Sequence, residues 1–303
     1  MTRVTLDKQV RVVKQLDGEL FRDSIPAALK QAQEHAADGG YILTFPELIQ
    51  ARLSLPDDHK IWGYVTPHTE EYVGTTRHGT PFGVVVHGPG LITSGALKHA
   101  YEHDCFGSSI RLVGEDIRRI SEGRLPSEKR IPVYGIDEIW RGVKDLPRQY
   151  AVIFNLRHLE GMPRDRIIPG DMSFDVMAVA RAGGSKEAQD YVNRILSDAE
   201  WNTYSRMPRD LANSRMLIDL ANLVHTSLDQ MDPSKPQGRM SIYFQDQDGN
   251  WTNEMFRGNG SFLAISGEEL REYRKSAFRK GLEQAYRSLF GSVEDASRAP
   301  KTT

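Results

Sequence analysis

The feature that most limits how this chain can fold is its single cysteine, Cys105. One thiol excludes a disulfide within the chain and a structural zinc site built on several cysteines. The chain has 303 residues, of which 39% are hydrophobic, so its length allows one large domain or two of ordinary size. This apolar content is typical of a globular protein that buries a real core. Side-chain packing therefore has to hold the fold without cross-links.

The first half of the chain alternates between strand and helix patterns. Two short apolar runs, Val10 to Leu16 and Tyr41 to Phe45, predict strands, and Ser24 to Ala37 between them predicts a helix. A strand, helix, strand order favours a parallel pair of strands. Farther along, the sequence predicts a hairpin, Tyr72 to Thr76 with Phe82 to Val86, and then a helix from Ser94 to Cys105.

The second half predicts an antiparallel region and a long final helix. Asp248-Gly249 between apolar runs is a strong hairpin signal, and a strand at Phe262 to Ile265 is expected to extend the hairpin into a meander. Ser266 and Glu269 have capping-box spacing and open a helix that runs to about Phe290. The other predicted elements are a strand at Tyr150 to Leu156, helices at Lys186 to Trp201 and Leu211 to Leu228, and a disordered tail at 297–303.

Together these patterns predict an α/β or α+β fold, with a mixed sheet, flanking helices and a C-terminal antiparallel hairpin or meander followed by a long helix. A charged stretch with glycines and prolines, 114–132, suggests an internal boundary. We expect an N-terminal α/β portion, 1–125, and a C-terminal α+β portion, 126–296. One continuous domain is the open alternative.

Charge and hydropathy narrow the class of protein. Lys and Arg together number 39 and Asp and Glu 41, which argues against a dedicated nucleic-acid binder. No run approaches eighteen apolar residues, and the N-terminus lacks the apolar block of a secretory signal. We therefore expect a cytoplasmic protein that does not span a membrane.

The sharpest chemical motif is His99-Ala100-Tyr101-Glu102-His103. On a helix, His99 and His103 share a face and can reach one ion, while Glu102 can deprotonate a metal-bound water. The motif resembles that of the inverzincin peptidases, which implies a divalent ion, zinc above all, and hydrolase chemistry. That family also uses a carboxylate ligand farther downstream, and this chain has no glutamate in the matching window. The alternative is an amphipathic helix with these residues on its solvent-exposed face.

Histidines also gather around this motif. Six of the nine lie within one 45-residue span, and His87 ends a predicted strand, where functional groups of α/β folds are often placed. His87 is therefore a candidate third metal ligand. The following Gly88-Pro89-Gly90 turn could present backbone N–H groups to an anion, so Gly88 and Gly90 are candidate binding residues. A plain chain reversal is the alternative.

Phe45-Pro46-Glu47 follows a predicted strand, helix and strand, and this opening resembles the nitrilase family of carbon–nitrogen hydrolases. The resemblance implies that Glu47 is a general base. That chemistry also needs a lysine and a nucleophilic cysteine after a later strand, whereas Cys105 comes too early and at a helical position. A covalent thioester is excluded, and Glu47 remains a candidate pocket carboxylate.

Three classes of function follow from these observations. We favour a metal-dependent hydrolase with His99, His103 and His87 as ligands and Glu102 and Glu47 as catalytic carboxylates, acting on a small-molecule or anionic substrate. A non-catalytic binder of small molecules or anions, whose pocket gathers Glu47, His68, His87 and the Gly88 to Gly90 turn, is the second. An oligomeric assembly protein that uses its C-terminal helix is the third.

Overall fold

The computed structural model describes the parts of the chain that build the core. These are residues 18–56, 59–62, 65–102, 109–159, 175–196, 231–240, 244–245, 251–252 and 259–290. The predicted strand at Val10 to Leu16, the predicted helix at Leu211 to Leu228, Cys105 and the tail at 297–303 lie outside these residues.

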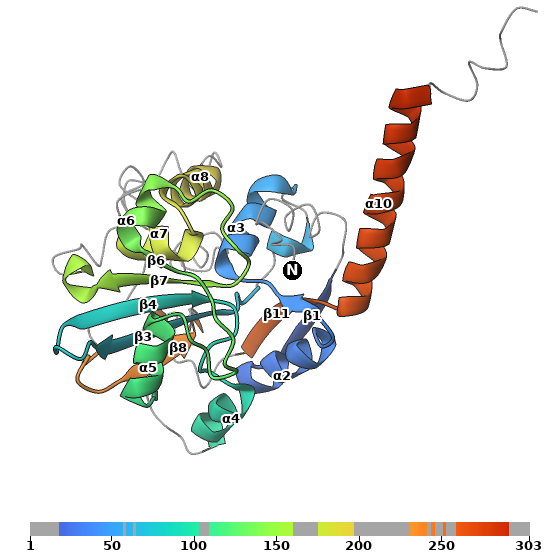
Figure 1. Cartoon of the computed structure of the whole chain (residues 1–303). Helices are drawn as coiled ribbons and strands as arrows, with labels where there is room; N and C mark the ends of the chain where they lie inside the picture. The colour runs from blue at the N-terminus through green and yellow to red at the C-terminus, as the bar shows by residue number, and fades with distance from the viewer. Residues whose placement is uncertain are drawn as a thin grey trace, which may run out of the picture.

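A six-stranded mixed sheet forms the centre of the molecule (Figure 1). Strands β6 and β7 run parallel, and every other neighbouring pair is antiparallel. The predicted hairpin of β3 and β4 is confirmed, with Gly74 opposite Phe82. In spatial order the strands are β5 (Ile110–Arg111), β8 (Gln237–Met240), β3 (Thr69–Thr75), β4 (Pro81–His87), β7 (Tyr150–Asn155) and β6 (Val133–Gly135).

The sheet is buried on both faces, which explains why β4 reads as an unbroken apolar run. Successive side chains of a strand point to opposite faces. Val84 and Val86 accordingly pack in one hydrophobic cluster, and Val85 packs in the other. The molecule therefore has three layers, with helices on each side of the sheet.

Among the described elements, four helices cover the face to which Val85 points, and three cover the other face (Figure 1). The first group is α3 (Phe45–Ser54), α6 (Ile136–Arg141), α7 (Val176–Ala182) and α8 (Ser185–Leu196). The second group is α2 (Ile25–His35), α4 (Ser94–Glu102) and α5 (Gly114–Ser121). The short 3₁₀ helices η1 (Lys60–Trp62) and η2 (Leu156–Leu159) join longer elements.

A second sheet brings distant segments of the chain together. Strand β11 (Asn259–Ile265) lies between β1 (Glu19–Ser24) and β2 (Tyr41–Ile42) and is antiparallel to both. β1, which the sequence did not predict, therefore runs in the same direction as β2, but the two strands are not neighbours. β11 does not extend the predicted meander; the hairpin strands β9 (Phe244–Gln245) and β10 (Trp251–Thr252) pair with each other.

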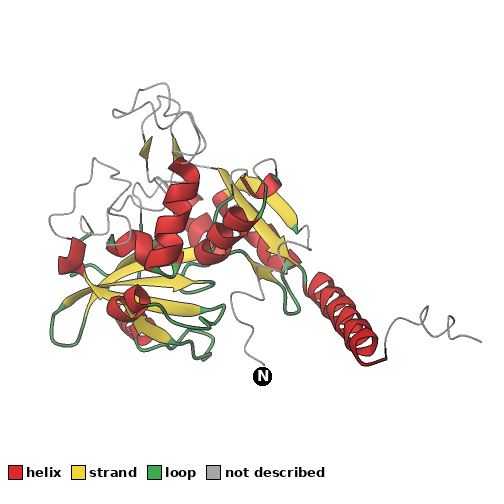
Figure 2. Cartoon of the chain, turned by 90° about the horizontal axis from the view of Figure 1, so that it is seen from above, coloured by secondary structure: helices red, strands yellow, loops and turns green. Residues whose placement is uncertain are grey.

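The last helix, α10 (Gly267–Phe290), extends away from the rest of the molecule (Figures 1 and 2). The predicted capping box is confirmed: the Ser266 N–H donates to Glu269 at 2.7 Å, and the Glu269 N–H donates to the Ser266 hydroxyl at 3.1 Å. Leu270 is buried, but Ala277, about two turns farther on, is exposed. Of the α10 side chains that the structure describes, those that pack on the core lie at the start of the helix.

Strands from both sides of the expected boundary near residue 125 belong to the same six-stranded sheet. β3, β4 and β5 precede that boundary, and β6, β7 and β8 follow it. The two portions consequently share one core. Among the described residues, no helix has the length and apolar character needed to cross a membrane.

Candidate functional site

Strand β3 carries polar side chains on both faces of the central sheet. His68, just before the strand, Glu70 and Tyr72 alternate along it and point to the face that is covered by α2, α4 and α5. Thr69 and Glu71 point to the opposite face. All five residues are buried. A buried carboxylate needs charged or hydrogen-bonding partners, so each face must supply them.

Glu70 holds the loop that follows β4. Its Oε1 accepts the Gly90 N–H at 2.8 Å, and its Oε2 accepts the Ile92 N–H at 2.8 Å. The Tyr72 hydroxyl donates to Glu70 Oε2 and accepts the Leu91 N–H at 2.7 Å. Burial, together with the negative charge of Glu70, raises the pKa of Tyr72 well above its ordinary value. Three consecutive amides are thus bound to two side chains of β3, and the loop is fixed in one conformation.

This arrangement corrects the expectation that Gly88 and Gly90 offer N–H groups to an external anion. The Gly88 N–H donates to the His68 carbonyl at 2.9 Å, and that of Gly90 donates to Glu70. The turn does bind a carboxylate, as its geometry allows, but the carboxylate is an internal one. Gly88 also has a φ of 105°, a conformation that favours glycine.

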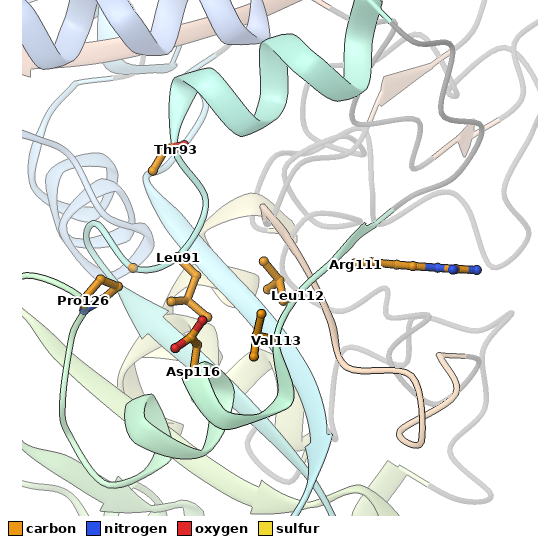
Figure 3. Close-up of a pocket in the computed structure, with 8 residues that line it drawn as sticks. Leu91, Thr93, Arg111, Leu112, Val113, Asp116 and Pro126 are labelled. Carbon is orange, nitrogen blue, oxygen red and sulfur yellow. The ribbon is translucent and has the colours of Figure 1, made fainter.

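The fixed loop forms one side of a surface groove of about 590 Å³ (Figure 3). β5 and the residues after it form another side, and the first turn of α5 closes the end. Apolar side chains dominate the lining, and Val113 among them is 63% exposed. The lining residues are Gly90, Leu91, Thr93, Arg111, Leu112, Val113, Asp116 and Pro126.

Asp116 supplies a carboxylate to this groove. Within the part of the chain that the structure describes, that carboxylate has no hydrogen-bond or ion-pair partner. Its neighbour Glu115 is paired with Arg118 at 2.9 Å. Figure 3 shows the Asp116 side chain beside Leu91, whereas the Arg111 side chain points away from both. The groove therefore combines apolar walls with one unneutralised negative charge.

His87, the candidate third metal ligand, is fully buried on the other face and has both ring nitrogens engaged. Nε2 lies 2.9 Å from the Ala180 carbonyl oxygen and must donate to it, so Nδ1 accepts the Thr69 hydroxyl at 3.3 Å. Burial lowers the pKa of His87 to about 4, although the Ala180 bond and Glu71 raise it. A neutral ring with both nitrogens used is not available to a metal.

The helical motif is only partly described. His99 lies on an exposed part of α4, Glu102 is exposed and paired with Lys98 at 3.6 Å, and His103 is outside the described residues. Across the described ranges no group of three or more histidine, cysteine, aspartate or glutamate side chains is placed to hold a metal ion. The structure thus separates His87 from the motif, and a zinc-dependent hydrolase that uses His99, Glu102 and His103 stays a prediction.

Glu47 lies in the first turn of α3 and is buried. Its Oε2 accepts the Thr44 N–H at 2.8 Å and the Thr44 hydroxyl at 2.9 Å, which caps the helix. Burial raises its pKa, although Arg148 and Thr44 act in the opposite direction. Glu47 does not line the groove.

Of the residues that line the groove, the sequence analysis named Gly90 as a candidate binding residue and did not name the others. Glu115-Asp116 looks like the acidic pair that commonly starts a helix, so nothing in the sequence marks Asp116 as unpaired. A signal for Glu70 and Tyr72 did exist. The run His68-Thr69-Glu70-Glu71 enters an otherwise apolar hairpin, and charged residues within a buried strand indicate internal partners.

We expect Glu70→Gln to loosen the groove. An amide offers one acceptor oxygen where the carboxylate uses two, so one of the loop N–H groups loses its partner, at a cost of about 1–3 kcal/mol. Hydrogen exchange at the Gly90, Leu91 and Ile92 amides should accelerate, while exchange at Val85 should change only as far as global stability does. Unchanged protection of the three loop amides would contradict this role, and the exposed Glu102→Gln serves as a control.

Comparisons with known proteins indicate the fold of this chain but not its family. No protein-family model matches the sequence, and no curated protein does either. One solved structure, described as "Accommodation of massive sequence variation in Nanoarchaeota by the C-type lectin fold", is similar with a TM-score of 0.50 and 14% identity. The match covers 82% of this chain and 95% of that one. The chain therefore has a C-type lectin-like α+β fold, in which β1 and β11 pair across the length of the sequence.

Proposed function

We propose that the protein is a binding protein whose groove takes a small organic cation with an apolar body. The observation that carries this proposal is the Asp116 carboxylate, which has no partner among the described residues and lies within apolar walls. One of these walls is a loop that Glu70 and Tyr72 hold in place. A cationic group would pair with Asp116, and a hydrocarbon body would displace water from Leu91, Leu112 and Val113.

The size and rigidity of the groove support the proposal. Its volume of about 590 Å³ falls within the roughly 300–1,000 Å³ that is common for small-molecule sites. A loop that already holds its bound conformation loses little conformational entropy when a ligand arrives. Glu70 and Tyr72 provide that rigidity from the buried strand β3.

The fold also supports a binding role. The similar solved structure is described as accommodating massive sequence variation, which requires a core that is independent of the varied surface. Here the groove side chains of Leu91, Leu112 and Val113 are at least partly exposed, while Glu70 and Tyr72 beneath them are buried. The lining could change without disturbing the core.

The test compares three probes of equal chain length: hexylamine, hexanoate and hexanol. We expect hexylamine to shift the NMR signals of Leu91, Leu112 and Val113, and Asp116→Asn to weaken this binding about tenfold, or roughly 1.4 kcal/mol. The matched control is Glu115→Gln, which removes the adjacent carboxylate that already pairs with Arg118. Hexanoate binding as well as hexylamine, or an unaffected Asp116→Asn variant, would refute the proposal, as would the absence of any binding.

A further inference from the structure

The final helix α10 carries two apolar runs on different sides of its axis. The inner run is Leu270, Tyr273 and Ala277. Leu270 is buried, and Tyr273 packs against the same hydrophobic cluster of the core. The outer run is Phe278, Leu282, Ala285 and Leu289. At about 100° per residue, the centre of the outer run lies roughly 120° around the helix from that of the inner run. The outer run therefore does not continue the side of α10 that faces the core.

The spacing of the outer run is typical of helix–helix pairing. Its positions follow one another at intervals of four, three and four residues, as the a and d positions of a heptad do. They fall within about 60° of the helix circumference, whereas a helix that lies on a core has an apolar stripe of about 100° or more. A helix on a membrane surface likewise needs a large apolar face. A narrow seam of this kind favours a single helix as the partner.

The helix has room for such a partner. α10 has 24 residues, so it is about 36 Å long, and it extends away from the rest of the molecule (Figures 1 and 2). Residues 274–277, 279 and 280 are all exposed, and in a helix these positions point to every side. A second helix can thus lie along α10 without displacing any described element.

Nearer the core, the same heptad register is basic. Carried back from the outer run, it places Arg271 and Lys275 in the seam and Arg274 beside it. All three residues are exposed. Between 271 and 280, five exposed basic residues outnumber the one acid, Glu272, which pairs with Lys275 at 2.6 Å. Arg271 donates to the Asp38 carbonyl at 3.3 Å, and Arg274 has no ion-pair partner among the described residues. This charge excess favours an acidic partner.

We propose that this side of α10 pairs with an acidic amphipathic helix of another protein. Apolar residues of the partner would pack along the outer run, and its carboxylates would pair with Arg274 and Lys275. A second copy of this chain fits less well. A parallel pair would place Lys275 opposite Lys275, and an antiparallel pair on the outer run would overlap only over 278–289, which is less than two heptads. The inference concerns α10 alone and does not depend on the function of the groove.

The test uses two synthetic peptides of about three heptads, titrated into the full-length protein and followed by fluorescence anisotropy. The acidic peptide has leucines in one half of its seam and glutamates in the other half and in the flanking positions. The basic peptide has lysines in place of the glutamates. We expect only the acidic peptide to bind, and Arg274→Glu and Leu282→Gln each to weaken this binding at least about tenfold.

Lys280→Glu is the matched control for Arg274→Glu. It makes the same change of charge on an exposed residue of the same helix, but on the side opposite the outer run, so peptide binding should stay within about twofold of the wild type. Leu282→Gln should leave the melting temperature unchanged, because the outer run does not face the core. A melting temperature lowered by several degrees would assign Leu282 to the core and contradict the proposal.

Three further measurements cover the other partners that a basic helix could have. They are binding to phosphatidylserine vesicles, binding to a duplex DNA and the sedimentation equilibrium of the protein alone. We expect each to show weaker association than the acidic peptide. Tighter binding to vesicles or DNA, a stable dimer at micromolar concentration, equal binding of the two peptides or no binding of either would each overturn the proposal.

Discussion

Replacing Glu71 with glutamine should lower the free energy of unfolding by about 3–5 kcal/mol, the usual cost of leaving buried charges without their partner. Glu71 is fully buried and binds two buried arginines. Nε of Arg181 donates to Oε1 at 2.6 Å, and Nε of Arg239 donates to Oε2 at 2.9 Å. Glutamine has nearly the same shape but would leave two guanidinium groups facing a neutral side chain. Urea unfolding measures the loss.

The pH dependence of this interaction has a definite sign. Burial alone would raise the pKa of Glu71, but the charges of Arg181 and Arg239 outweigh burial and hold it at about 2, below the ordinary 4.5. A lowered folded-state pKa means that the stabilisation is complete above pH 4.5 and is lost as the pH falls toward 2. The shift corresponds to about 3 kcal/mol.

The control is an ion pair of the same chemistry at the surface. Glu122 pairs with Arg124, and both side chains are more than 40% exposed, so Glu122→Gln should change stability by less than about 1 kcal/mol. If Glu71→Gln and Glu122→Gln have equal effects, the buried network does not stabilise the fold in the way that its geometry implies.

His87 should make the protein progressively less stable between pH 6.5 and pH 4. Burial lowers its folded-state pKa to about 4, whereas the unfolded chain takes up the proton near pH 6.5. The unfolded state therefore gains stability first as the pH falls, and the folded state loses about 3 kcal/mol relative to it by pH 4. Above pH 6.5 this contribution does not vary.

Denaturation at a series of pH values tests the effect. His87→Gln removes the titrating group, so its stability should be lower at pH 7 yet almost flat between pH 6.5 and pH 4. His78→Gln, in the exposed turn between β3 and β4, should keep the slope of the wild type. A His87→Gln variant that retains the full slope would show that other groups cause it.

Local patterns in the sequence predicted local structure well. The β3–β4 hairpin follows from two β-rich runs around Gly79 and Pro81, and the capping box at Ser266 and Glu269 fixes where α10 begins. Both features depend on residues close together in the sequence. The mixed character of the fold follows in the same way, from alternating strand and helix patterns.

Partners that are distant in the sequence could not be predicted. β11 looks like a third hairpin strand, yet it lies between β1 and β2, because strand pairing across a chain leaves no local signal. In the sequence, His87 stands at the end of a strand as a candidate metal ligand. In the structure its ring contacts the Ala180 carbonyl of α7, which is 93 residues away in the chain. Gly90 was predicted to offer its N–H to an external anion, but in the structure that N–H donates to the internal carboxylate of Glu70.

The pairing of β1 with β11 also has a consequence for how the chain reaches its folded state. Arg22 and Ser261, which contact each other across these strands, are 239 residues apart. At translation speeds of about 5–20 residues per second, the ribosome needs roughly 10–50 s to make the intervening chain. During that interval β1 and the newly made β2 both lack β11, the strand with which each of them pairs. This small sheet can therefore form only after β11 has been made.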